Sequence, residues 1–149
     1  MKLMKRIVIL ASVVAALVSS LGVADAMWVK LSDADLIDGS DIIVSAELIG
    51  QTQFRVAPDQ PKLTVGVLRV DEVLKGDAGI SVALLVLPSP NAPRSSTDLV
   101  YRKGQKGLWF LQVRDQKDSG LHRADHPQRF VPLEQSAQID AFKRLLKKQ

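Results

Sequence analysis

Short apolar runs separated by turn residues occupy most of the chain after residue 40, and this spacing permits few folds. The runs cover residues 42–49, 62–74, 80–87, 108–113 and 121–123. They are rich in Val, Ile and Leu and are bounded by segments containing Gly, Pro or polar residues, which is typical of β-strands. Helical segments do not alternate with the runs, which argues against a parallel doubly wound sheet. We therefore predict a mostly β fold with five strands.

The longest run contains an irregularity. Leu63, Val65 and Val67 would share one face of a strand, but the apolar pattern then slips by one residue at Leu68. Such a slip predicts a β-bulge or a strand that serves two packed faces, and small barrels need strands that bend in this way. The polar, proline-containing segments 51–61 and 88–97 predict loops.

Two helices are predicted to flank the strands. Ser32 is suited to accept a hydrogen bond from a first-turn N–H, Asp33 and Asp35 sit where the helix dipole favours anions, and Asp38-Gly39 ends this short leading helix. A C-terminal helix is predicted from apolar residues at helical spacing, with basic residues in its last turn. These apolar residues are Ile139, Phe142, Leu145 and Leu146.

The first 26 residues have the pattern of a secretory signal peptide. A basic start is followed by an almost unbroken apolar run over residues 7–17, and Ala24-Asp25-Ala26 supplies the small residues that signal peptidase reads. We expect cleavage between Ala26 and Met27, which leaves residues 27–149 as one domain. The expected location is the periplasm or the extracellular space.

A retained membrane anchor is the alternative for this leader. The 18 residues from 7 to 24 approach the lower limit of roughly 17–25 for a spanning helix. Ser19, Ser20 and Gly22 make the second half weakly apolar, and a basic stop-transfer cluster does not follow. The pattern favours cleavage, after which no membrane association is expected. With the leader retained, the chain would be a membrane-tethered envelope module.

Charge and cysteine content narrow the possible partners. After removal of the leader, 17 Lys and Arg face 15 Asp and Glu, a formal charge of about +2 that does not predict nucleic-acid binding. The chain has no cysteine, so disulfides, thiolate chemistry and lipoprotein acylation are excluded. A domain of ~120 residues can bury enough apolar surface to be stable unaided.

Three segments together resemble a group of small exported bacterial domains. They are SDADLIDGSDIIVSAEL at residues 32–48, VLRVDEVLKG at residues 67–76, and the stretch from Gly104 to Leu111. These domains are similar to the OB-type barrel of tissue inhibitors of metalloproteinases and netrin modules. The resemblance covers most of residues 32–131 and implies a five-stranded OB-like barrel, while a fold does not by itself fix a function.

The activity of those inhibitors does not carry over by this resemblance. They present an N-terminal cysteine, whose amine and carbonyl chelate the zinc of the target. The mature chain is expected to begin Met27-Trp28 and has no cysteine.

Six side chains are candidates for binding. Trp28 either packs over the barrel mouth or anchors a partner, because Trp is enriched at binding hot spots. Tyr101 is expected at the barrel rim, and the basic residues near the His-Pro segment either bind an anion or are solvated. The full set is Trp28, Tyr101, His122, Arg123, His126 and Arg129.

A metal-assisted hydrolase is the enzymatic alternative. His122, Asp125 and His126 offer two imidazoles and a carboxylate, which would leave an open position on a zinc ion. Pro127 and the strand-like Leu121 argue against the helix that would place both imidazoles together, so a polar loop is the competing interpretation. The sequence contains no nucleophile elbow, phosphate-binding loop or dinucleotide fingerprint. We therefore predict a non-enzymatic exported binding domain without metal or cofactor, with another envelope protein as the possible partner.

Overall fold

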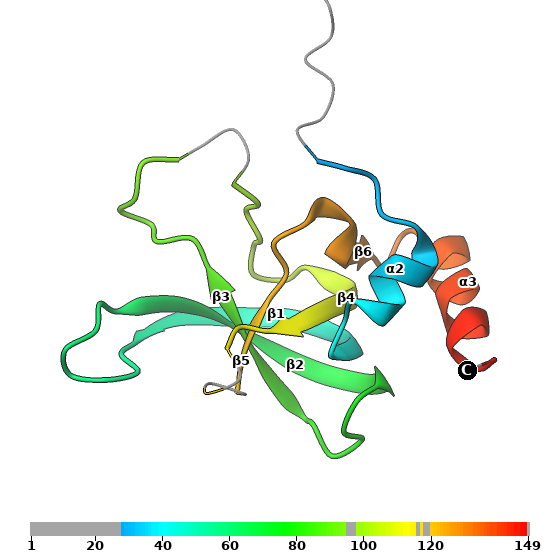
Figure 1. Cartoon of the computed structure of the whole chain (residues 1–149), viewed down its shortest axis with the longest axis horizontal. Coiled ribbons are helices and arrows are strands. Elements are labelled where there is room, and N and C mark those ends of the chain that lie inside the picture. The colour runs from blue at the N-terminus through cyan, green and yellow to red at the C-terminus, as the bar shows by residue number, and fades with distance from the viewer. Residues whose placement is uncertain (1–27, 95–97, 116, 118–119, 149) are drawn as a thin grey trace, which may run out of the picture.

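The computed structural model describes residues 28–94, 98–115, 117 and 120–148 (Figure 1). The predicted signal peptide and its cleavage point between Ala26 and Met27 lie outside this range. The elements in chain order are α2 (Asp33–Asp38), β1 (Ile42–Phe54), β2 (Leu63–Lys75), β3 (Val82–Leu87), β4 (Lys106–Val113), β5 (Leu121–Arg123), the 3₁₀ helix η1 (Pro127–Arg129), β6 (Phe130–Pro132) and α3 (Ser136–Leu146). None of the described helices is long and apolar enough to cross a membrane.

Five strands form a closed ring of pairings. β1 pairs with β2 and with β4, and β2 pairs with β3. β5 closes the ring because it pairs with β3 in parallel orientation and with β4 in antiparallel orientation. β6 adds to β4 beside β5. The fold is therefore mostly β, as the apolar runs predict. In Figure 1, α2 and α3 lie together on one side of the strands, and the loop after β3 projects away from them.

Irregular pairing bends the long β1–β2 hairpin. Register shifts occur at three places along β1, and Ile49 is left over where Leu48 pairs with Leu68 and Gly50 pairs with Val67. The irregularity that the sequence predicts near Val67 is found there. The extra residue, Ile49, belongs to β1 and not to β2. Bulges increase local twist and bend strands, which helps the hairpin curve into the ring.

Three sequence expectations about strands need correction. β1 continues to Phe54, through residues 51–54 of the predicted loop, because these residues pair with the start of β2 in an exposed hairpin that needs no apolar residues. β4 begins at Lys106 rather than at residue 108. The structure also adds a sixth strand, β6, whose three residues are too few to show a periodicity.

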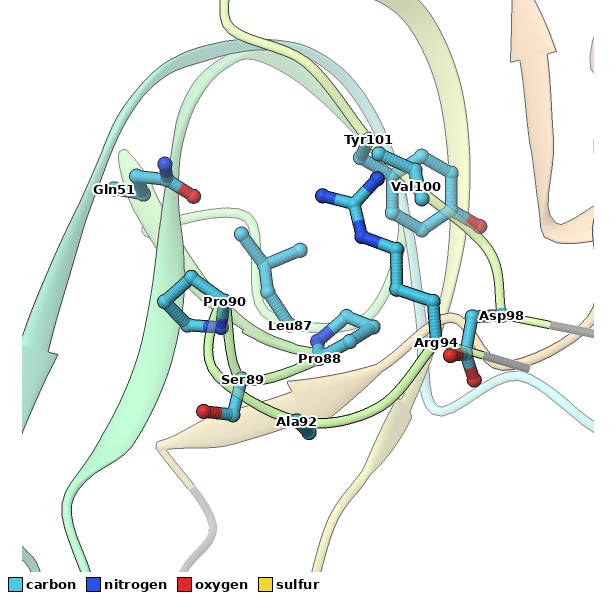
Figure 2. Close-up of a pocket in the computed structure, with 10 residues that line it drawn as sticks. All are labelled: Gln51, Leu87, Pro88, Ser89, Pro90, Ala92, Arg94, Asp98, Val100 and Tyr101. Carbon is cyan, nitrogen blue, oxygen red and sulfur yellow. The ribbon is translucent and has the colours of Figure 1, made fainter.

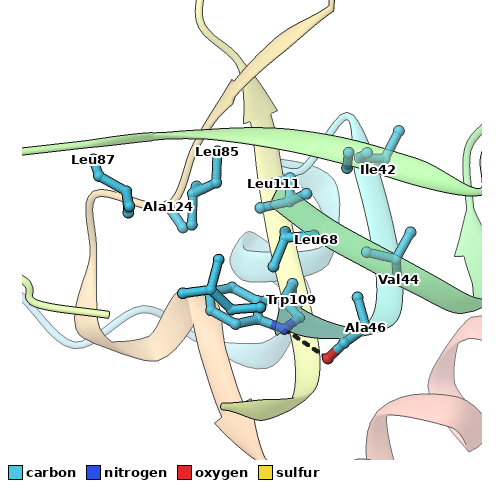
Figure 3. Packing of buried hydrophobic residues seen from close by; sticks show 11 residues of the cluster. Ile42, Val44, Ala46, Leu68, Leu85, Leu87, Trp109, Leu111 and Ala124 are labelled. Atoms are coloured by element: carbon cyan, nitrogen blue, oxygen red, sulfur yellow. Dashed lines mark hydrogen bonds between the residues drawn. The ribbon is translucent and has the colours of Figure 1, made fainter. Parts of the chain in front are cut away.

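Strand β4 contributes to two separate cores, which explains its continuous apolar run. Trp109 and Leu111 point into the ring, where the indole Nε1 donates to the carbonyl oxygen of Ala46 at 3.0 Å (Figure 3). Leu108 and Phe110 point outward, and Phe110 meets Phe142 of α3 at a ring distance of 4.8 Å. The ring interior is filled by Ile42, Val44, Ala46, Leu48, Leu68, Ala83, Leu85, Leu87, Trp109, Leu111 and Ala124.

The leading helix begins as the sequence predicts. Ser32 Oγ accepts a hydrogen bond from the backbone N–H of Asp35 at 3.1 Å, which satisfies one of the free N–H groups of the first turn. Leu36 and Ile37 of this helix are buried in the outer core beside α3. Both predicted helices therefore cover the same outer surface of β1 and β4.

Candidate functional site

Three hollows that share lining residues extend from the end of β3 to β1, and we name them together the β3 groove. Their volumes are about 150, 450 and 500 Å³. Leu87, Pro88 and Asp98 line both the first and the second hollow, and Gln51 and Tyr101 line both the first and the third. Figure 2 shows the first hollow, where the side chain of Arg94 reaches back between Leu87 and Tyr101 in this view. Other lining residues include Trp28, Val86, Leu99, Val100, Arg102, Lys103, Arg123, Ala124 and Asp125.

The groove opens because two neighbouring strands of the ring diverge. β3 pairs with β2 as far as Leu87, whereas its pairing with β5 ends at Leu85, opposite His122. Pro88 directly follows Leu87, and a proline has no N–H with which to continue the hydrogen-bond ladder. The second hollow lies between the end of β3 and the Arg123–Asp125 side of the ring.

Residues 28–31, which we name the strap, form one wall of the groove through Trp28. Trp28 is half-buried and meets the ring of His126 edge to face at 5.3 Å. The Nδ1 atom of His126 accepts from the N–H of Gln128 at 3.2 Å, so its Nε2 donates to the carbonyl of Val29 at 2.9 Å. The Gln128 amide bonds both backbone groups of Leu31. His126 therefore holds the strap and caps η1.

Tyr101 connects the groove to the core. Its hydroxyl donates to the carbonyl of Ala124 at 2.8 Å, and its ring meets Trp109 edge to face at 5.1 Å. Burial, helped by the charge of Asp125, raises the pKa of Tyr101 far above its usual range. Tyr101 is consequently a neutral hydrogen-bond donor that fixes one side of the groove.

His122 does not reach the groove surface. It is only 7% exposed, and its Nδ1 atom has no hydrogen-bond partner among the described residues. Burial lowers the pKa of His122 despite opposing contributions from the backbone of Leu84 and the charge of Asp41. His122 is thus a buried neutral residue in the strand that closes the ring.

Neither alternative for Arg129, an anion site or a solvated charge, describes its position in the structure. Arg129 is 6% exposed, and its guanidinium donates to Ser40 Oγ at 3.1 Å and to the carbonyl of Phe110 at 3.2 Å. A weaker contact reaches the carbonyl of Gly39 at 3.4 Å. The guanidinium is used to join the turn after α2 to β4. Arg123, by contrast, is exposed and lines the groove.

The three candidate metal ligands are not brought together as a site. His122 is buried in β5, and both ring nitrogens of His126 bond to backbone groups. In the described ranges no group of three or more His, Cys, Asp and Glu residues could hold a metal ion. The arrangement needed for metal-assisted hydrolysis around His122, Asp125 and His126 is therefore not formed by these residues. The spacing fails because β5 ends between the two histidines.

Of the six candidate binding residues, the structure brings Trp28, Tyr101 and Arg123 to one groove. Sequence reasoning missed Arg94, Arg102 and Lys103, which lie in segments with the composition of ordinary turns. The only signal was their position beside Tyr101 or in the proline-rich loop, and this signal does not show which loops meet in space.

Comparison with known proteins adds no relatives. No protein-family model matches this chain, and no curated protein matches it. The chemistry of the groove is thus the guide to function.

Proposed function

We propose that this chain is an exported, non-enzymatic binding domain with an OB-like barrel of the type found in tissue inhibitors of metalloproteinases and netrin modules. The closed ring of five strands supports this assignment, as does the apolar core that fills its interior. The signal-peptide pattern of residues 1–26 supports export to the periplasm or beyond. The proposed partner is another envelope protein.

The composition of the β3 groove is the observation that carries this proposal. Half-buried Trp28 and Tyr101 lie beside apolar Leu87 and Leu99, with arginines at the margin. Aromatic residues and arginine are enriched at protein interfaces and dominate their binding energy. The aromatic side chains are held in place by hydrogen bonds and ring contacts, so little conformational entropy would be lost on binding.

Site-specific photo-crosslinking in cells tests this function. A photoreactive residue replaces Val100, which lines the groove and is 48% exposed. The matched control replaces Val82, which is 53% exposed and does not line the described groove. We expect a discrete crosslinked product in the envelope fraction from position 100 and none from position 82. Equal products from both positions, or none from either, would contradict the proposal.

A further inference from the structure

We propose that this domain forms a two-fold symmetric dimer through the free edge of β1 at residues 50–54, where a second copy of the chain adds its own β1 in antiparallel orientation. The inference goes beyond the proposed function, because it does not depend on what the β3 groove binds. It follows from the direction of the backbone groups, the absence of charge on this edge and the order of its side chains.

The last part of β1 is paired on one side only. The pairing of β1 with β4 ends at Glu47, and Leu48 makes the last contacts on that side, with both of its backbone groups bonded to the turn at residues 104–105. From there to Phe54, β2 is the partner of β1 among the described residues. Figure 1 shows the end of this hairpin extending away from α2 and α3. Residues 51–54 are exposed, so a second strand can reach this edge.

Alternation along β2 shows which of its backbone groups face β1. Val70 N–H donates to the carbonyl of Ser81 at 2.9 Å, on the β3 side of the strand. The register between β2 and β3 is unbroken over residues 64–69, and backbone groups alternate sides along such a strand. Those of Val65 and Val67 are therefore directed toward β1.

Gln51 and Gln53 consequently present the free backbone groups of β1. Gly50 lies opposite Val67 and Thr52 lies opposite Val65, so the backbone groups of Gly50 and Thr52 face β2. The alternate residues, Gln51 and Gln53, direct their N–H and C=O groups away from β2. In the described part of the chain these outward groups have no hydrogen-bond partner.

This edge lacks the features that usually keep strand edges from pairing. Residues 50–54 include no charged side chain and no proline, although natural edges are commonly blunted by charge or proline. Two other strand ends show this protection. The end of β2 beyond its pairing with β3 carries Asp71 and Glu72, and Lys143 of α3 binds Glu72 at 2.6 Å. The short β6 ends in Pro132.

The free backbone groups select one register for a second copy. The register that bonds both residues within each strand places Gln51 of one copy opposite Gln53 of the other, in a hydrogen-bonded pair. Thr52 then lies opposite Thr52 on the two-fold axis, in a non-hydrogen-bonded pair whose side chains are close. Threonine pairs across antiparallel strands are stabilising.

The same register is complementary in side-chain size. It places Phe54 of each copy opposite Gly50 of the other. A Cβ atom at Gly50 would meet nothing within 4 Å, so there is room for a ring, and Phe54 is a large apolar side chain that is 37% exposed in the single chain. An aromatic ring packed across from a strand glycine compensates for the missing side chain.

The symmetry of this pairing sets the size of the assembly. Each copy uses the same edge once, so the interface is isologous and association stops at two copies. Because the paired segment is short, the interface is small, and we expect a Kd on the order of tens of micromolar.

Single cysteines test the register, because the chain has none of its own. In the processed, exported chain, Thr52→Cys would place two thiols across the axis at a Cα separation of about 4.5 Å, which a disulfide can bridge. The matched control is Gln53→Cys, a neighbouring exposed position whose two copies would lie roughly 8 Å apart, too far for a disulfide. Under mild oxidation we expect Thr52→Cys to form a disulfide-linked dimer at least about tenfold faster than Gln53→Cys.

Charge placed on the axis tests the association itself by analytical ultracentrifugation. Thr52→Lys and Thr52→Glu should each raise the Kd at least about tenfold, because like charges directly opposite one another destabilise paired strands. An equal mixture of the two variants should recover a dimer, since opposite charges then meet on the axis. The control, Val82→Lys, adds a charge at an exposed position of β3 and should leave the Kd unchanged.

Several results would overturn the inference. These are a wild-type chain that stays monomeric up to about 0.5 mM, equal rates of disulfide formation at positions 52 and 53, a mixture of the lysine and glutamate variants that does not associate, or growth beyond two copies. Photo-crosslinking at position 100 tests the groove separately. If that product forms while the chain stays monomeric, the dimer fails and the proposed function stands.

Discussion

His122 lies in an environment that disfavours the charged form of its side chain. Its side chain is buried in the three-residue strand β5, and its Nδ1 atom lacks a partner in the described part of the chain. A buried imidazole that takes up a proton must hold a charge away from water, and the charge of Asp41 offsets this effect only in part. The strand that closes the ring therefore contains a buried imidazole whose pKa is lowered in the folded state.

We predict that acid destabilises the domain through His122. The unfolded chain binds a proton near the ordinary pKa of 6.5, whereas burial lowers the pKa in the folded state. The unfolded state thus binds more protons as the pH falls, and the free energy of unfolding should decrease from pH 7 to pH 5. The slope for one proton is at most about 1.4 kcal/mol per pH unit.

Urea unfolding of the wild type and His122→Leu at pH 7, 6 and 5 measures this effect. The variant keeps an apolar side chain of similar size in β5 and should lose most of the decrease. A decrease of the same size in both proteins would contradict the assignment to His122.

At the scale of elements, the short β6 strand depends on a glycine in β4. Gly107 pairs with Pro132, and a Cβ atom there would collide with the carbonyl oxygen of Val131 and approach Phe130 to 3.0 Å. Phe130 in turn packs on Trp109 at a ring distance of 4.2 Å. The close approach of the two backbones therefore places an aromatic ring against the inner core.

We predict that Gly107→Ala lowers the free energy of unfolding by about 1–3 kcal/mol, the usual cost of overpacking. The matched control is Gly50→Ala in β1, because a Cβ atom at Gly50 meets nothing within 4 Å. The control should change stability by no more than about 0.5 kcal/mol. Chemical unfolding of both variants is the measurement, and a tolerated alanine at 107 would show that β6 can move away without cost.

For the whole molecule, the described domain already contains a complete ring and both cores. The strap begins at Trp28 and is bonded to η1, so the groove wall starts within two residues of the expected cleavage point. Cleavage at the expected point would therefore leave Trp28, which lines the groove, as the second residue of the chain.

We predict that protein recovered from the envelope fraction begins at Met27 and contains 123 residues. N-terminal sequencing and the intact mass measure this directly. The reason is the small-residue pattern at Ala24 and Ala26 after a moderately apolar run. A chain that starts at Met1 and stays with the membrane would instead show that the leader is retained as a tether.

Local patterns in the sequence determined most elements of this protein. Ser32 and its following aspartates predict α2, and the apolar runs predict β2, β3 and β5 closely and the cores of β1 and β4. These predictions succeed because hydrogen-bond capping and side-chain alternation depend on residues that are neighbours in the chain. β6 and the end of β1 were not predictable in this way, since their backbones are ordered by partners distant in sequence.

Only the tertiary structure decided the roles of the candidate site residues. Trp28, Tyr101 and Arg123 meet at one groove, while Arg129 is buried among carbonyl groups and the two histidines are separated. A side chain's type shows what chemistry it can perform, but its burial and partners depend on which strands close the ring. Here the divergence of β3 from β5 after Leu85 opens the groove, and the residues at that opening come from segments far apart in the chain.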